Sequence, residues 1–140
     1  GAADEARAGV SFPVWNKNDR LERNEEVYVL RIDGHPKAFV VERALAKGVV
    51  NDAVGTVRVV LVADSRSGSI RAYERGERSF RWNDEDQLVD DRERTWSLTE
   101  EALTTTNDGG ETESLKRLPG HVAFWFGWYG FYPDTDLWGD

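Results

Sequence analysis

The fold is decided by residues 26–41, whose sequence is EVYVLRIDGHPKAFVV. Residues 26–32 are rich in β-branched and aromatic side chains, a composition that is typical of a strand. Asp33-Gly34 is a strong signal for a tight hairpin turn, because both residue types accept the positive φ that such turns require. Residues 37–41 supply the returning strand. This stretch therefore predicts an antiparallel β-hairpin.

The same kind of pattern continues after the hairpin. Residues 42–47 predict a short helical turn that ends at Gly48. The Val- and Leu-rich run at residues 56–63 is the best candidate for a buried strand. Residues 100–106 are ambiguous. Further short strands are predicted at residues 70–75, 79–82, 87–90 and 95–98, and the most flexible loop is predicted at residues 107–113.

Short strands that are separated by turns, followed by one late helix, predict an α+β fold that is mostly antiparallel β. The length of 140 residues suits one domain. We expect residues 26–140 to form a single compact domain of short strands with a C-terminal aromatic helix. Residues 1–25 are expected to form an extended arm, because Pro13 restricts its own φ and the conformation of Phe12. Trp15 is expected to pin this arm to the domain.

The composition excludes several classes of function. Eighteen basic against 26 acidic residues give a net charge of −8, which argues against a nucleic-acid partner and against adsorption to an anionic membrane. The chain has no cysteine, so disulfides, thiolate metal sites and cysteine nucleophiles cannot be proposed. No run approaches the ~20 apolar residues of a membrane-spanning helix. We therefore expect no transmembrane segment.

Residues 121–135, with the sequence HVAFWFGWYGFYPDT, concentrate aromatic side chains in one place. They predict a helix that Pro133 ends, with apolar side chains around nearly its whole circumference, whereas a surface helix keeps a polar face. The domain can enclose this helix alone, or a second protein can cover the remaining face, as aromatic residues often do at interfaces. The expected partner-binding residues are Phe124, Trp125, Phe126, Trp128, Tyr129, Phe131, Tyr132 and Trp138.

Catalytic motifs are missing from the sequence. His35 and His121 are isolated, whereas a metal site needs several converging ligands. The serines of the loop at residues 64–69 are not part of a nucleophile elbow. The carboxylates crowded between residues 84 and 93 are expected to be a solvated edge. We therefore predict no catalytic residue, no metal and no cofactor.

The order of several segments resembles a known family. These segments are Ile32-Asp33-Gly34, Lys37-Ala38-Phe39, the run from Val49 to Gly55, the run from Gly68 to Arg75, Leu88-Val89-Asp90-Asp91-Arg92, the run from Thr95 to Thr99, Trp125, and the run from Phe131 to Thr135. In this order they resemble the family called domain of unknown function 3179, found in bacterial and archaeal proteins that are often exported. The resemblance covers residues 26–138.

The departures from that family concern its reactive side chains. Typical members carry Tyr-Cys-Pro-x-Cys-Gly just before the place of Gly68-Ser69, and a histidine shortly before the Asn-Asp pair. In this chain the two cysteine places fall at Asp64 and Ser67, and the histidine place falls at Gly48. A thiol pair with a nearby histidine implies soft-metal or redox chemistry. Asp, Ser and Gly cannot reproduce it, so the resemblance implies a retained scaffold without the reactive group.

These observations predict a non-catalytic accessory or structural subunit that makes protein–protein contacts in a larger, membrane-associated assembly. We expect an extracytoplasmic location, periplasmic or secreted, and attachment to the membrane complex through a partner. Two alternatives remain open. The first is a metal-binding or redox-related protein that uses Asp64, Ser67 and His121. The second is a carbohydrate-binding module in which Trp138 lies beside Asp134 and Asp136.

Overall fold

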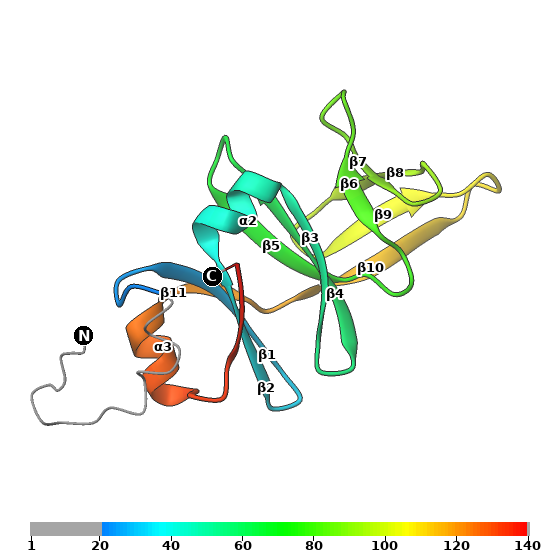
Figure 1. Ribbon diagram of the computed structural model, residues 1–140. Coiled ribbons are helices and arrows are strands. Elements are labelled where there is room, and N and C mark those ends of the chain that lie inside the picture. Colours follow the sequence, from blue (N-terminus) through cyan, green and yellow to red (C-terminus); the bar gives the residue numbers. More distant parts are fainter. Residues whose placement is uncertain (1–20, 140) are drawn as a thin grey trace, which may run out of the picture.

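The hairpin predicted at residues 26–41 is present in the computed structural model, which describes residues 21–139 (Figure 1). Strand β1 (Glu26–Ile32) pairs with β2 (His35–Val40), and Tyr28 lies opposite Phe39. Asp33 and Gly34 form the turn with φ of 51° and 79°, so both central positions have the positive φ that the sequence indicated. Strands β11 (His121–Phe124) and β12 (Asp136–Trp138) complete a four-stranded sheet in the order β11-β1-β2-β12.

A second sheet has eight strands in the order β3-β4-β5-β10-β9-β8-β7-β6. Each neighbouring pair of this sheet is antiparallel, and β12 with β2 is the one parallel pair among residues 21–139. The prediction of a mostly antiparallel α+β fold is therefore confirmed. The strands are β3 (Val49–Val54), β4 (Val57–Asp64), β5 (Ser69–Glu74), β6 (Phe80–Trp82), β7 (Leu88–Asp90), β8 (Thr95–Leu98), β9 (Ala102–Thr106) and β10 (Thr112–Leu118).

Within residues 21–139, two short helices accompany the sheets, α2 (Val41–Lys47) and α3 (Trp125–Phe131). Helix α2 ends at Gly48, as predicted, with φ of 85°. The aromatic segment is less helical than predicted, because its first four residues form β11 and pair with β1. The helix spans only seven residues; glycine and proline are poor helix formers, and Pro133 follows its end.

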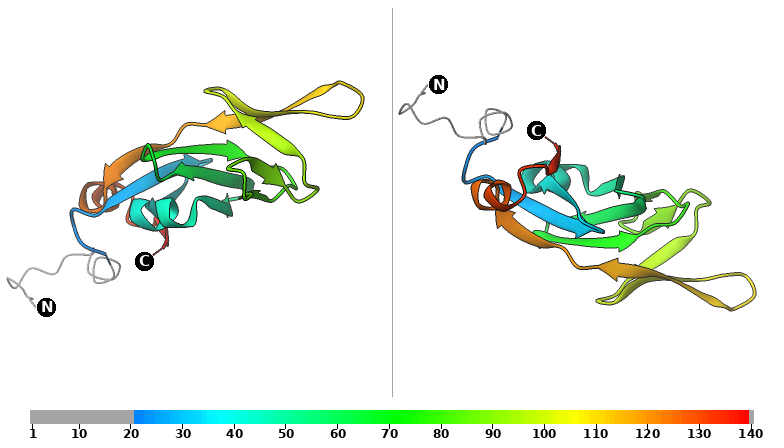
Figure 2. Two further views of the ribbon diagram at one scale, coloured as in Figure 1. Left: turned by 90° about the horizontal axis from the view of Figure 1, so that it is seen from above. Right: turned by 90° about the horizontal axis from the view of Figure 1, so that it is seen from below.

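The buried apolar residues form three clusters, which lie between the sheets and helices of the described chain. Alternate residues of β1 face opposite sides: Val27 and Val29 pack against α3, whereas Tyr28 and Leu30 pack against α2 and the central strands β3, β4 and β5. A third core lies between these central strands and β6 to β9. Figure 2 shows the result, with α3 at one end of an elongated molecule and the β9–β10 hairpin at the other.

Three further points of the sequence analysis concern residues 100–106, Trp15 and membrane-spanning helices. Residues 100–106, left ambiguous by the sequence, contain strand β9. Trp15, the predicted anchor of an N-terminal arm, lies outside the described residues. In the described part of the chain, neither helix combines the length and the apolar character needed to cross a bilayer.

Candidate functional site

Two of the three positions at which the chain departs from the family motif lie at one pocket. This pocket, of about 290 Å³, lies where α2 and β4 end and where the β6–β7 turn approaches them. Gly48 and Asp64 both line it. Ser67 does not line it and instead donates a hydrogen bond from Oγ to Ser69 Oγ at 3.0 Å. We call this space the motif pocket.

Trp82 occupies the space next to Gly48. Its indole Nε1 donates to the Gly48 carbonyl oxygen at 3.1 Å, and the same oxygen accepts from the Ala63 backbone N–H at 2.8 Å. A Cβ atom built on Gly48 would lie 3.0 Å from Trp82 Cδ1. A side chain at position 48 would therefore displace the indole as well as adopt a φ that L-residues avoid.

One side of the motif pocket is polar and is formed by Asp64, Arg66 and Asp86. The Arg66 guanidinium lies between two carboxylates, 3.5 Å from Asp64 and 4.0 Å from Asp86. A hydrogen bond of 2.9 Å from the Arg66 backbone N–H, with the Arg66 charge, lowers the pKa of Asp64 below its ordinary value. The side chains of Arg66 and Asp86 are largely exposed and that of Asp64 is partly exposed, so the ion pairs contribute little stability. The sequence did not indicate Trp82 or Asp86, because their approach depends on how the β6–β7 hairpin folds back.

Two other residues from the segments that carry the family resemblance, Asp52 and Thr135, have structural roles. Asp52 makes an ion pair of 2.7 Å with Lys37, which joins the two sheets. Thr135 is fully buried, donates to the Tyr132 carbonyl oxygen at 2.6 Å and accepts from Trp128 Nε1 at 2.9 Å.

A family model described as "Protein of unknown function (DUF3179)" matches residues 2–135.

The chain belongs to the DUF3179 family. No curated protein and no solved structure matches it. In this DUF3179 protein the motif pocket presents the Asp64 carboxylate and Gly48, and Ser67 lies outside the pocket. The resemblance implies a thiol pair and a histidine at these three positions.

The expectation that the carboxylates at residues 84–93 form a solvated edge is wrong for Asp90. Its side chain is fully buried, whereas its neighbour Asp91 is exposed. Asp90 Oδ2 accepts from Trp96 Nε1 at 2.9 Å, and Oδ1 accepts from the backbone N–H groups of Arg92 and Arg94 at 2.8 and 2.9 Å. Arg94 and Arg78 add positive charge at 3.4 and 3.7 Å from Oδ2.

The pKa of Asp90 reflects this environment. Burial by itself raises the pKa of the carboxyl, but the hydrogen bonds from Trp96 and from the two backbone N–H groups, with the Arg94 charge, outweigh burial and lower the pKa. Asp90 therefore anchors the β7–β8 hairpin rather than acting as a surface charge.

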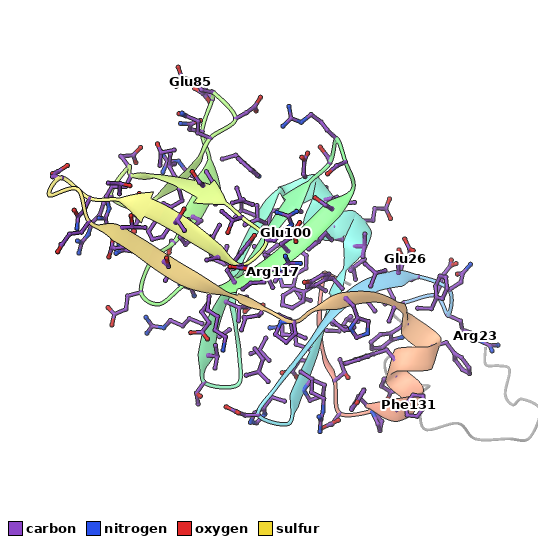
Figure 3. The ribbon with its side chains drawn as sticks, turned by 180° about the vertical axis from the view of Figure 1, so that it is seen from behind. Arg23, Glu26, Glu85, Glu100, Arg117 and Phe131 are labelled. Carbon is purple, nitrogen blue, oxygen red and sulfur yellow. The ribbon has the colours of Figure 1, made fainter. Side chains whose placement is uncertain are left out.

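The predicted partner-binding residues differ in their exposure to solvent: five are buried or half-buried, and three are exposed. Trp125 and Tyr129 are buried between α3 and the β1–β2 hairpin, and Trp128, Tyr132 and Trp138 are half-buried. The remaining three are exposed at 60% for Phe124, 44% for Phe126 and 84% for Phe131. One face of α3 thus completes a core, and the exposed phenylalanines lie at the end of the molecule that carries Arg23, Glu26 and Phe131 in Figure 3.

The two alternative sites are not assembled in the described residues. His121 is on β11, where its ring lies 6.0 Å from that of Trp128, whereas Asp64 ends β4 in the other sheet. Within residues 21–139, no three His, Asp or Glu side chains are grouped to hold a metal ion. Trp138 packs against Phe39, and the shallow pocket beside it is lined by Arg43 and Lys47. Asp134 and Asp136 are exposed and do not line that pocket.

Proposed function

We propose that this protein is a non-catalytic accessory subunit that binds another protein through the end of the molecule formed by β11 and α3. We call the exposed side chains of Val122, Phe124, Phe126 and Phe131 the aromatic end surface. The observation that carries the proposal is that these exposed apolar side chains are concentrated in one short segment of the chain. Among residues 21–139, every large apolar side chain that is strongly exposed belongs to this set, within a segment of ten residues.

The physical argument is the cost of leaving this surface in water. Single exposed apolar residues are ordinary, but several in one segment favour an interaction site. A phenylalanine side chain buries 150 Å² or more when it is covered, worth about 2–3 kcal/mol. Arg23 lies over the Phe126 ring at 4.1 Å, so even this edge of the surface combines apolar area with a polar rim, as interfaces do.

The motif pocket supports the non-catalytic part of the proposal. The carboxylate of Asp64 and the hydroxyl of Ser67 cannot perform thiolate chemistry, and a histidine at position 48 would collide with Trp82. Our proposal of a membrane-associated, extracytoplasmic assembly rests on the resemblance to the family, whose members are often exported.

Native mass analysis of the endogenous protein tests the proposal. We expect the protein to occur in a complex with other subunits. Phe131→Asp should release it from that complex while its circular dichroism spectrum stays unchanged, because this side chain is 84% exposed. Ser114→Asp, at an exposed position of β10, is the matched control and should leave the complex intact.

Two outcomes would overturn the proposal. If the endogenous protein runs alone at its monomer mass, it is not an accessory subunit. If Phe131→Asp, Phe126→Asp and Phe124→Asp all remain in the complex, the aromatic end surface is not the interface.

A further inference from the structure

We infer that the open edge of β11 binds a basic, extended peptide segment of a partner protein, which adds a strand to the four-stranded sheet. This inference rests on the proposed function and names the chemistry of the partner. It follows from three features of one region: a strand edge that no strand among residues 21–139 occupies, a groove with apolar side chains on the adjoining face of the sheet, and acidic side chains around that groove.

The strand edge is available for pairing. Strand β11 is at the end of its sheet and, among the described residues, pairs only with β1. The Trp125 backbone N–H donates to the Glu25 carbonyl oxygen at 2.9 Å, which continues the β1–β11 ladder. Hydrogen-bonded positions alternate along an antiparallel ladder, so the backbone groups of Val122 and Phe124 point to the open side. Unpaired groups of this kind are a template for another strand.

A groove lined by apolar and acidic side chains lies between Phe124 and α2, on the face of the sheet next to this edge. It has a volume of about 550 Å³, and its apolar lining comes from Phe124 at the end of β11 and from Val41 and Leu45 on α2. Val122 and Phe124 are opposite Tyr28 and Glu26 in the ladder, so their side chains share the face of the sheet that meets α2. An added strand would direct every second side chain onto the face of the sheet that carries this groove.

The rim of the groove is acidic. Glu25, Glu26 and Glu42 line it, and no basic residue does within the described range. None of these three glutamates makes an ion pair with another residue of the described chain. Their charges are thus left for a partner to neutralise, and lysine or arginine side chains that flank an apolar residue would do so.

The negative charge of the protein makes two other occupants of this edge unfavourable, namely a second copy of the chain and an anionic membrane. Pairing of β11 with β11 of a second copy would bring two acidic grooves together, each on a chain with a net charge of −8, and like charges at an interface are unfavourable. An anionic membrane surface is repelled for the same reason. A basic segment of another protein is the occupant that satisfies the backbone edge, the apolar groove and the glutamates at once.

Selection from a library of displayed random 12-residue peptides tests the inference. We expect the enriched peptides to carry lysine or arginine in alternation with apolar residues, and to bind more weakly as salt rises. Val122→Pro removes one outward N–H and spares the inward hydrogen bonds, a change that edge strands tolerate. It should weaken the enriched peptides at least about tenfold.

A pair of double variants tests whether the charges of the groove glutamates contribute to peptide binding without affecting the fold. Glu26→Gln with Glu42→Gln changes two exposed side chains and should weaken binding about threefold to tenfold. The matched control is Glu85→Gln with Glu101→Gln, which removes the same charge from residues that do not line the groove. Figure 3 shows Glu85 at the tip of the β6–β7 turn, on a different part of the molecule from Glu26. The control should bind as the unmodified protein does. Circular dichroism verifies the fold of each variant.

The inference is overturned if no peptide is enriched, if the enriched peptides are acidic, or if folded Val122→Pro binds them unchanged. It is also overturned if the protein prefers phosphatidylglycerol vesicles to every enriched peptide. In each of these cases the endogenous complex can still be released by Phe131→Asp, so failure of the peptide site is distinguishable from failure of the proposed function.

Discussion

The side-chain amide of Asn51 acts as a strand partner for Phe80. Asn51 Nδ2 donates to the Phe80 carbonyl oxygen and Asn51 Oδ1 accepts from the Phe80 backbone N–H, both at 2.9 Å. Asn51 is on β3 and Phe80 begins β6, the two end strands of the eight-stranded sheet. One amide thus joins the ends of the sheet, which encloses the core of Val60, Tyr73 and Trp96.

Asn51→Ala tests this closure. The variant removes two hydrogen bonds and leaves both backbone groups of Phe80 unpaired, so we expect the free energy of unfolding to fall by about 1–3 kcal/mol. Urea denaturation measures the loss. Ser114→Ala, at an exposed position of β10, should change the unfolding free energy by less than about 0.5 kcal/mol. Equal stability of Asn51→Ala and the unmodified protein would show that the sheet does not depend on this amide.

Asp90→Asn should destabilise the protein in a pH-dependent way. At neutral pH the variant leaves the positive charges of Arg94 and Arg78 without their buried carboxylate, and the cost is on the order of 3 kcal/mol. The pKa of Asp90 is lower in the folded chain than its ordinary value of 3.8. Its stabilisation is therefore fully present above the unfolded pKa and is lost as pH falls through the folded pKa.

The measurement is urea denaturation of both proteins between pH 7 and pH 2. The difference in unfolding free energy should be constant down to about pH 5 and should shrink below about pH 4. Asp91→Asn, the exposed neighbour, is the matched control and should be close to neutral throughout. A difference that stays constant to pH 2 would contradict the assignment.

Trp125 and Phe131 should respond differently to truncation although they begin and end the same helix. Trp125 is fully buried, so Trp125→Ala should lower the unfolding free energy by about 3–5 kcal/mol. Phe131→Ala should change it by less than about 0.5 kcal/mol. Trp125→Phe should cost clearly less than Trp125→Ala, because the indole Nε1 has no hydrogen-bond partner in the described chain. Thermal denaturation followed by circular dichroism measures all three.

Comparing Gly48→Ala with Gly68→Ala measures how much stability is lost when a side chain at position 48 displaces Trp82. Gly48 and Gly68 have positive φ of 85° and 77°, but an added Cβ meets Trp82 at position 48 and nothing within 4 Å at position 68. Both alanine variants should lose about 1 kcal/mol from backbone conformation. The additional loss in Gly48→Ala reports displacement of the indole. Equal losses in urea denaturation would show that Trp82 moves aside without cost.

The sequence predicted local structure well where pattern and turn chemistry agree. The strands at residues 26–32 and 95–98 have the predicted bounds, and the Asp33-Gly34 turn and the Gly48 helix end are as expected. The family was also recognised from the order of segments. The aromatic helix was predicted too long, because pairing of β11 with β1 is a long-range contact that no local pattern encodes.

The sequence alone determined the β-rich class, the missing thiols and the concentration of aromatic residues near the C-terminus, because composition and periodicity are properties of the chain itself. Only the tertiary structure decided which of these residues face the solvent and which charges are buried. Trp125 and Phe131 look alike in the sequence, and so do Asp90 and Asp91, yet one of each pair is enclosed and the other is exposed. The physical reason is that burial depends on which distant strands pack against a residue, and that choice is made by the whole chain at once.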